Sequence, residues 1–253
     1  MSGGTGMMNK WLAAAILAVS FLVVAPMAHG QEKGAVREGF SAETLSGKKI
    51  LLFRPSVWVG EQSTGGLAEP NADWTAQARE FLNAELARRQ IEFSNELIIE
   101  PDLVGEDAKL FSEHRALFNS VASSVVNYQF FAGNRLPTRK NKAFDWTLGE
   151  GTKAIAERTG AQYGLFVRTE DQYGSFGRKM FQVLAIGLVG AGVSSGKHVG
   201  YAGLVDLHTG NLVWLNADEQ MGGDVRTEEG MQKRVGQLLE DFPGFKPVAT
   251  ATK

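Results

Sequence analysis

The sequence contains no cysteine, few histidines and no long block of basic residues. Without cysteine, the chain can form neither disulfides nor thiolate metal sites, and it cannot be lipidated at a cysteine. Its 26 Lys and Arg residues against 28 Asp and Glu residues give a formal net charge of −2. This balance, without a basic block, argues against nucleic acid as a partner.

The sequence also lacks an apolar run long enough to span a membrane. The longest run, Trp11–Ala25, has fifteen residues, whereas a spanning helix needs about 20. Lys10 precedes this run, and the small residues Ala28 and Gly30 follow it. This pattern predicts a signal peptide over residues 1–30, cleaved before Gln31, and a periplasmic location for the mature protein.

The rest of the chain is predicted to form one domain. Residues 31–47 are polar and punctuated by glycine, so we expect a flexible lead there. Residues 48–243 are expected to form a single α/β domain with an apolar, glycine-rich insertion at 173–200. Residues 244–253 are expected to be a disordered tail.

Hydrophobic periodicity predicts the elements of this domain. Strands are expected at Ile50–Phe53, Ile91–Glu100 and Tyr163–Thr169, and helices at Asp73–Arg89, Glu106–Tyr128, Asp145–Gly160 and after Thr227. Asp73 is expected to cap the first helix, and Val57–Asn71 to be a loop. In the second helix, Leu110, His114, Leu117, Val121 and Val125 are expected to face the core. The fold class is therefore α/β (α+β), with a small mixed sheet of three to five strands and helices packed on it.

A β-hairpin is predicted at Val199–Gln220, followed by the last helix. Gly210 can take the positive φ that closes the turn, and Asp206 can accept hydrogen bonds from backbone amides there. Thr209 belongs to the same turn, and Trp214 supplies apolar bulk on the second strand. We interpret these four residues as structural.

This hairpin and an earlier joint resemble a family of bacterial envelope proteins. The residues that carry the resemblance are Thr159-Gly160-Ala161-Gln162-Tyr163 between a helix and a strand, and Leu204–Trp214, which reads aliphatic, Asp, two residues, Thr-Gly and then Trp. The segments are similar to those of CsgG, the TolB N-terminal domain and LpoB. The resemblance implies a mixed α/β fold and an envelope location. It does not imply a pore, because this chain has only one candidate insertion.

Three catalytic or nucleotide-binding motifs are nearly present in the insertion. Ala191–His198 approaches a phosphate-binding loop, but His198 stands where Ser or Thr should hold Mg²⁺. Gly190-Ala191-Gly192 begins a dinucleotide fingerprint that Ser195 breaks. Ser175 stands in an imperfect nucleophile elbow. We therefore expect no cofactor.

The insertion is better interpreted as a packing or contact element. Its candidate contact surface consists of large apolar side chains: Met180, Phe181, Val183, Leu184, Ile186, Leu188 and Val189. Such a segment must be covered by its own domain, by a second copy or another envelope protein, or, less favoured, by a membrane surface.

Neither metal binding nor catalysis is predicted. His114, His198 and His208 are isolated in the sequence, and adjacent carboxylates such as Glu170 and Asp171 point to opposite sides of a strand. We expect a non-catalytic periplasmic protein that binds a protein partner or itself. The alternatives are a periplasmic serine hydrolase using Ser175 or the Ser194-Ser195 pair, and an outer-membrane-associated secretion or assembly component that uses the insertion.

Overall fold

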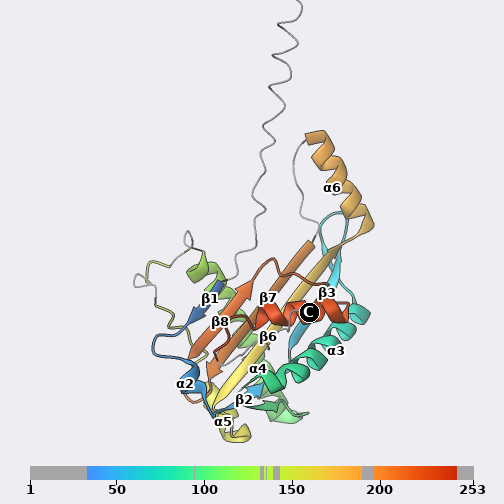
Figure 1. Cartoon of the computed structure of the whole chain (residues 1–253). Helices are drawn as coiled ribbons and strands as arrows, with labels where there is room; N and C mark the ends of the chain where they lie inside the picture. Colours follow the sequence, from blue (N-terminus) through green and yellow to red (C-terminus); the bar gives the residue numbers. More distant parts are fainter. Residues whose placement is uncertain are drawn as a thin grey trace, which may run out of the picture.

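The computed structural model describes residues 33–93, 95–131, 134, 136–138, 143–189 and 196–243. Its strands are β1 (Lys33–Val36), β2 (Lys49–Leu52), β3 (Ser56–Gln62), β4 (Ala68–Pro70), β5 (Glu96–Ile99), β6 (Tyr163–Gly174), β7 (Gly196–Asp206) and β8 (Leu212–Asp218). Its helices are α2 (Ala42–Leu45), α3 (Ala72–Arg89), α4 (Gly105–Val125), α5 (Lys153–Thr159), α6 (Phe176–Val189) and α7 (Glu228–Leu238). Short 3-10 or π turns lie at Gln90–Glu92, Val126–Phe130 and Glu150–Thr152. Figure 1 shows helices packed on a mixed sheet, which confirms the predicted fold class.

The long strand β6 organises the sheet. In the described part of the chain the sheet has eight strands, ordered β1-β8-β7-β6-β2-β5, and β3 pairs with both β4 and β6. The first residues of β6 pair in parallel with β2, and its second half pairs in parallel with β3. β7 pairs antiparallel with β6 along almost its whole length. The sheet is therefore larger than the three to five strands expected.

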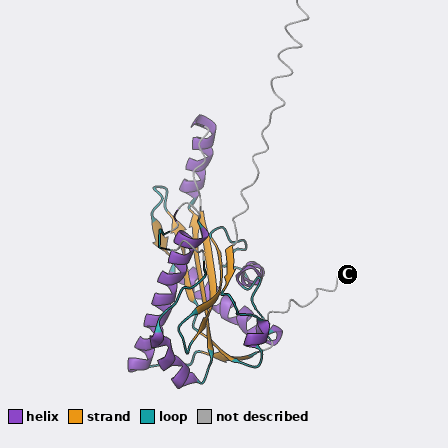
Figure 2. Ribbon diagram, turned by 90° about the vertical axis from the view of Figure 1, so that its left-hand side faces the viewer, coloured by secondary structure: helices purple, strands orange, loops and turns teal. Residues whose placement is uncertain are grey.

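Helices cover both faces of this sheet (Figure 2). On one face, α3 and α7 bury apolar side chains such as Leu82 and Val235 against Leu165 of β6. On the other face, α4 and α5 pack on Phe166, and Phe118 of α4 stacks on its ring at 4.6 Å between centroids. Because successive residues of a strand point to opposite faces, β6 contributes to both cores.

Two predicted irregular segments instead form strands. Residues Val57–Asn71, expected to be a loop, contain β3 and β4, because Val57 and Val59 alternate into the core. Gly60 marks a close approach of backbones, since a Cβ there would lie 2.3 Å from the Glu69 carbonyl oxygen. Part of the expected flexible lead, Lys33–Val36, pairs antiparallel with β8 as β1.

Three helix predictions also need correction. Asn71, not Asp73, caps α3, and its Oδ1 accepts the Trp74 backbone N–H at 2.9 Å. On α4, the buried face is centred on Phe111 and Phe118, whose rings bury more apolar area than Leu117, which is 39% exposed.

The predicted helix start at Asp145 is also wrong. The segment before α5 is extended and hydrogen-bonds to the hairpin turn, with the Leu148 N–H donating to the Gly210 carbonyl oxygen at 2.8 Å. The helical residues begin at the 3-10 turn and continue as α5. The expected signal peptide (1–30) and tail (244–253) lie outside the described residues.

The predicted hairpin consists of β7 and β8. Asp206 accepts the His208 and Thr209 backbone N–H groups at 2.8 and 3.3 Å, and Gly210 has a φ of +73°. Thr209 Oγ1 accepts the Asn211 N–H, and Trp214 is fully buried between the sheet and α7. Each of these groups is used to close the turn or fill the core.

Candidate functional site

The most unusual feature of the molecule is α6, which projects from one end of the sheet (Figure 1). β6 extends beyond the core to Gly174, and the helix begins directly after Ser175. The Ser175 hydroxyl accepts the Arg178 backbone N–H at 3.1 Å and so caps the first turn. We call Phe176–Val189 the α6 arm.

Large apolar side chains of the α6 arm are exposed. Their exposed fractions run from 47% to 81% for Phe176, Met180, Phe181, Val183, Leu184 and Ile186. Five of these belong to the candidate contact surface; the side chains of Leu188 and Val189 lie outside what the structure describes. At 100° per residue these positions are spread around most of the helix rather than along one stripe. Large exposed apolar patches are rare on monomeric soluble proteins and are typical of protein or membrane interaction sites and of ligand-binding grooves.

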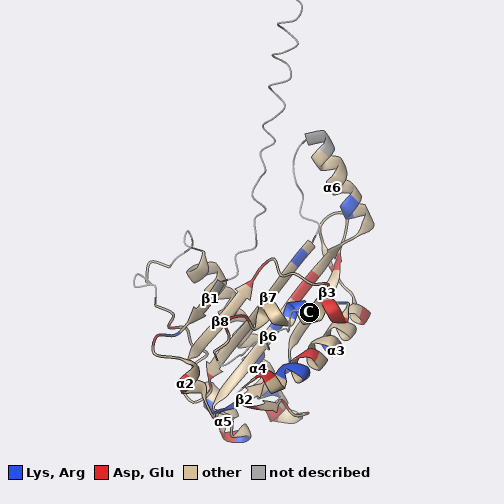
Figure 3. Cartoon of the chain, viewed as in Figure 1, with Lys and Arg blue, Asp and Glu red and all other residues tan. Residues whose placement is uncertain are grey.

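The charges of the arm are confined to its base. Arg178 and Lys179 lie in the first turn, and Phe176–Val189 contains no acidic residue. Figure 3 shows the basic colour at the base of α6 and none farther along the described part of the helix. Beyond the base, the described part of the arm therefore carries no charge, and its large side chains other than Gln182 are apolar.

A stacked polar cluster holds the base of the arm. The Arg226 guanidinium lies 3.7 Å from the Tyr173 ring centroid and 4.7 Å from that of Trp74. It also donates two hydrogen bonds to Asp224, which accepts the Tyr173 hydroxyl at 2.8 Å. Hydrogen bonds from Arg226 hold the pKa of Asp224 far below its usual value, while burial and the nearby carboxylates raise that of Tyr173. The cluster ties the end of β6 to α3 and to the segment before α7.

A buried ion pair lies beneath this cluster. Asp171 on β6 and Arg234 on α7 are both 0% exposed and share two hydrogen bonds of 2.7 and 2.8 Å. The Thr169 hydroxyl and His198 Nδ1 lie 2.9 and 2.7 Å from the same carboxylate. Burial alone would raise the pKa of Asp171, but hydrogen bonds from His198 and Arg234, with the Arg234 charge, hold it below its usual value.

The Asp171–His198 contact has the form of the acid–histidine half of a catalytic triad. Its carboxylate, however, already binds Arg234 and Thr169. In the described part of the chain, no serine hydroxyl hydrogen-bonds to His198 or His208, and Ser175 is occupied in capping α6. Ser194 and Ser195 lie outside the described residues.

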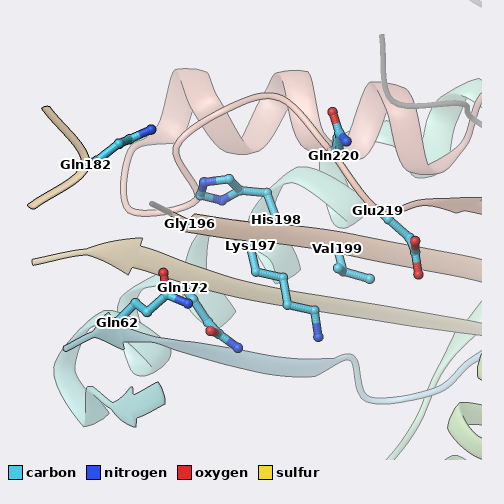
Figure 4. A pocket seen from close by; sticks show the side chains of 9 residues that line it. All are labelled: Gln62, Gln172, Gln182, Gly196, Lys197, His198, Val199, Glu219 and Gln220. Carbon is cyan, nitrogen blue, oxygen red and sulfur yellow. The ribbon is translucent and has the colours of Figure 1, made fainter. Parts of the chain in front are cut away.

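A hollow of about 770 Å³ lies beside the base of the α6 arm (Figure 4). It is lined by Gln62, Gln172, Gln182, Gly196, Lys197, His198, Val199, Glu219 and Gln220. In Figure 4, Lys197 and His198 point to opposite sides of β7. Lys197 pairs with Glu170 at 2.9 Å, so Glu170 and Asp171 serve different faces, as expected for neighbours on a strand.

The three histidines considered as metal ligands in the sequence do not lie together in the structure. His114 faces the core from α4, His198 lies on β7, and His208 lies in the hairpin turn. Within the described residues, no group of three or more metal-ligating side chains is found.

In the described residues, no helix is both long and apolar enough to cross a membrane. The phosphate-loop-like residues 191–195 lie outside the described part, and Gly196–His198 form the start of β7.

The buried ion pair is the arrangement that sequence reasoning missed. Arg234 falls on the apolar stripe of α7 with Met231, Val235 and Leu238. A charged residue at such a position indicates a buried partner, because an isolated charge in a core is costly. The sequence could therefore have pointed to Arg234, although not to Asp171.

Comparisons with known proteins give only remote similarities. No family model matches the chain, and no curated protein matches its sequence. A PelC L103M dodecamer from Paraburkholderia phytofirmans is similar at 12% identity, covering 85% of this chain and 99% of that one, with a TM-score of 0.36. The LpoB C-terminal domain from Salmonella enterica is similar at 16% identity, with 73% and 88% covered and a TM-score of 0.25.

Lipoprotein GNA1162 from Neisseria meningitidis is similar at 12% identity, with 67% and 77% covered and a TM-score of 0.26. LpoB is one of the proteins that the hairpin and the Thr-Gly-Ala joint resemble. TM-scores this low support no argument about function.

Proposed function

We propose that this protein is a non-catalytic component of the bacterial cell envelope that acts by self-association through the α6 arm. The observation that carries the proposal is the exposure of six large apolar side chains on a helix outside the body of the protein. The secretory pattern at the N-terminus and the motif resemblance support the envelope location.

The distribution of charge favours a second copy of the chain as the occupant. A helix of 14 residues is about 21 Å long. If two arms pair antiparallel around a two-fold axis, Arg178 and Lys179 of each copy lie at opposite ends. The apolar side chains on the two facing sides then cover one another, those on the other sides are left for further copies, and the basic residues of paired arms do not face each other.

A non-catalytic role is supported by the way polar groups are used. Asp171 binds Arg234, Ser175 caps the arm, and Asp206 closes the hairpin turn. In the described part of the chain, the candidate nucleophile Ser175 and the carboxylates Asp171 and Asp206 therefore each have a structural role.

The test is the mass of the purified protein in solution, measured by light scattering over a range of concentrations. A variant carrying Met180→Gln, Val183→Gln, Leu184→Gln and Ile186→Gln keeps good helix formers while removing apolar area. A control variant carries Ile91→Gln and Val104→Gln, which remove apolar side chains that are 89% and 87% exposed elsewhere.

We expect the wild-type protein and the control to form dimers or larger species, and the α6 variant to be monomeric with an unchanged melting temperature. A monomeric wild-type protein overturns self-association. If that monomer floats with vesicles of anionic lipid, and the α6 variant does not, the arm contacts membrane instead. The melting temperature of a variant with residues 180–193 replaced by a Gly-Ser linker checks that the arm is not needed for folding.

A further inference from the structure

A crevice at the carboxyl ends of β2 and β5 lies far from the α6 arm in the chain and has no part in the function proposed above. β2 and β5 are neighbouring parallel strands. The helix that follows β2 and β3, α3, packs on one face of the sheet, and α4, which follows β5, packs on the other. In open α/β sheets, ligands bind in the crevice where the connections diverge in this way.

The structure has a hollow at this point. Its volume is about 500 Å³, and its lining comes from Leu52, Phe53, Arg54, Pro55, Arg79, Asn83, Ala87, Ile99, Glu100 and Asp102. This size lies within the range of small-molecule sites, roughly 300–1,000 Å³. Ile99, on the edge strand, is 54% exposed, so an apolar group placed in the crevice would cover it.

The polar side chains of the crevice leave an unpaired positive charge. Arg54 donates to Asp102 at 2.8 Å. The buried Glu100 carboxylate accepts the Arg54 backbone N–H at 2.7 Å and also binds the Arg115 guanidinium. Within the described part of the chain, the Arg79 side chain has neither a hydrogen bond nor an ion pair. One guanidinium therefore remains available to an anion.

Asn83 stands one turn after Arg79 on α3, so both side chains reach the same part of the crevice. A guanidinium presents two parallel N–H groups that match the two oxygens of a carboxylate, and an amide can add a further donor. Apolar side chains of Leu52, Pro55 and Ile99 lie in the same hollow. The arrangement suits one anionic group joined to an apolar body.

We propose that this crevice binds a carboxylate carrying an apolar side chain, held by Arg79 and Asn83 at one end and covered by Ile99 at the other. Such a group occurs in small organic acids and at the C-terminus of a peptide. Both carry a carboxylate next to an apolar group, and the probes below distinguish between them.

The experiment is an NMR titration of the isotope-labelled protein, read at the backbone amides of Asn83 and Ile99. The probes are N-acetyl-leucine, its uncharged amide, acetate, and an acetylated pentapeptide ending in leucine with a free carboxylate. The variants are Arg79→Gln and Ile99→Thr, and Lys153→Gln on α5 is a control that removes one positive charge outside the crevice.

We expect N-acetyl-leucine to bind about tenfold more tightly than its amide or acetate, because a charge-assisted pair and an apolar contact are both needed. Arg79→Gln and Ile99→Thr should each weaken binding several-fold, and Lys153→Gln should not. Tighter binding of the pentapeptide assigns the site to chain termini, and equal binding assigns it to small acids. Equal shifts for acid and amide, or full binding by Arg79→Gln, overturn the proposal.

Discussion

At the scale of single residues, the most consequential contact is the fully buried pair of Asp171 and Arg234. Each charge has lost its hydration, and each is compensated by the other and by Thr169, His198 and backbone carbonyl oxygens. Removing one member of a buried pair costs much more than removing both, because a lone charge is left in the core.

Replacement of Arg234 by Met should therefore lower the free energy of unfolding by about 3–5 kcal/mol. The double variant Arg234→Met with Asp171→Asn should recover most of this loss, since no buried charge remains. Urea unfolding monitored by circular dichroism measures both.

The matched control is Arg88→Met. Arg88 is 54% exposed and pairs with Glu85, which is buried but keeps its bond to Arg89 when Arg88 is lost, so the substitution should cost less than about 1 kcal/mol. Equal losses for Arg88→Met and Arg234→Met would contradict the account given for the buried pair.

At the scale of elements, the β7–β8 turn is held from outside the hairpin. A Cβ at Gly210 would lie 2.0 Å from the Gly149 carbonyl oxygen, and the backbone there has positive φ. Gly160, the C-cap of α5, also has positive φ, but no atom lies within 4 Å of its added Cβ. The two glycines thus separate conformational strain from steric overlap.

We predict that Gly160→Ala costs about 1–2 kcal/mol of unfolding free energy, the usual price of a left-handed alanine. Gly210→Ala should cost about 3 kcal/mol or more, because the segment before α5 must also move. Thermal and urea unfolding of the two variants gives the comparison. A smaller effect at Gly210 than at Gly160 would show that the contact with Gly149 is not tight.

At the scale of the whole molecule, acid should destabilise the fold. The pKa values of Asp171 and Asp224 are below their usual values in the folded state. Below a pH of about 4 the unfolded chain binds protons at these groups that the folded chain does not. Their contribution to stability is therefore complete above that pH and is lost as the pH falls further.

We expect the contribution of Asp171 and Asp224 to the unfolding free energy to be nearly constant between pH 7 and about 5. This contribution should fall below about pH 4. The Asp171→Asn, Arg234→Met variant should show a shallower fall, because one of the two groups no longer titrates. Urea unfolding at a series of pH values measures the slope. Identical slopes for this variant and the wild-type protein would rule out a contribution from Asp171.

Local patterns in the sequence were enough for several elements. The apolar run at Ile50–Phe53 predicts β2, and Thr227 predicts the cap of α7, where its hydroxyl accepts the Gly230 N–H at 3.1 Å. The turn of the hairpin follows from Asp206 and Gly210, because both act on groups within a few residues. These features depend on neighbours in the chain, which a sequence displays directly.

The sequence by itself thus determined the absence of thiol chemistry, the α/β class, the hairpin and the unusual apolar character of the insertion. Only the tertiary structure decided that β3 joins the sheet, that Asp171 meets Arg234 from 63 positions away, and that the insertion stands clear of the body as α6. It also decided the crevice between α3 and the end of β5. These are contacts between distant segments, set by which faces of the sheet the helices cover, and local periodicity carries no information about that choice.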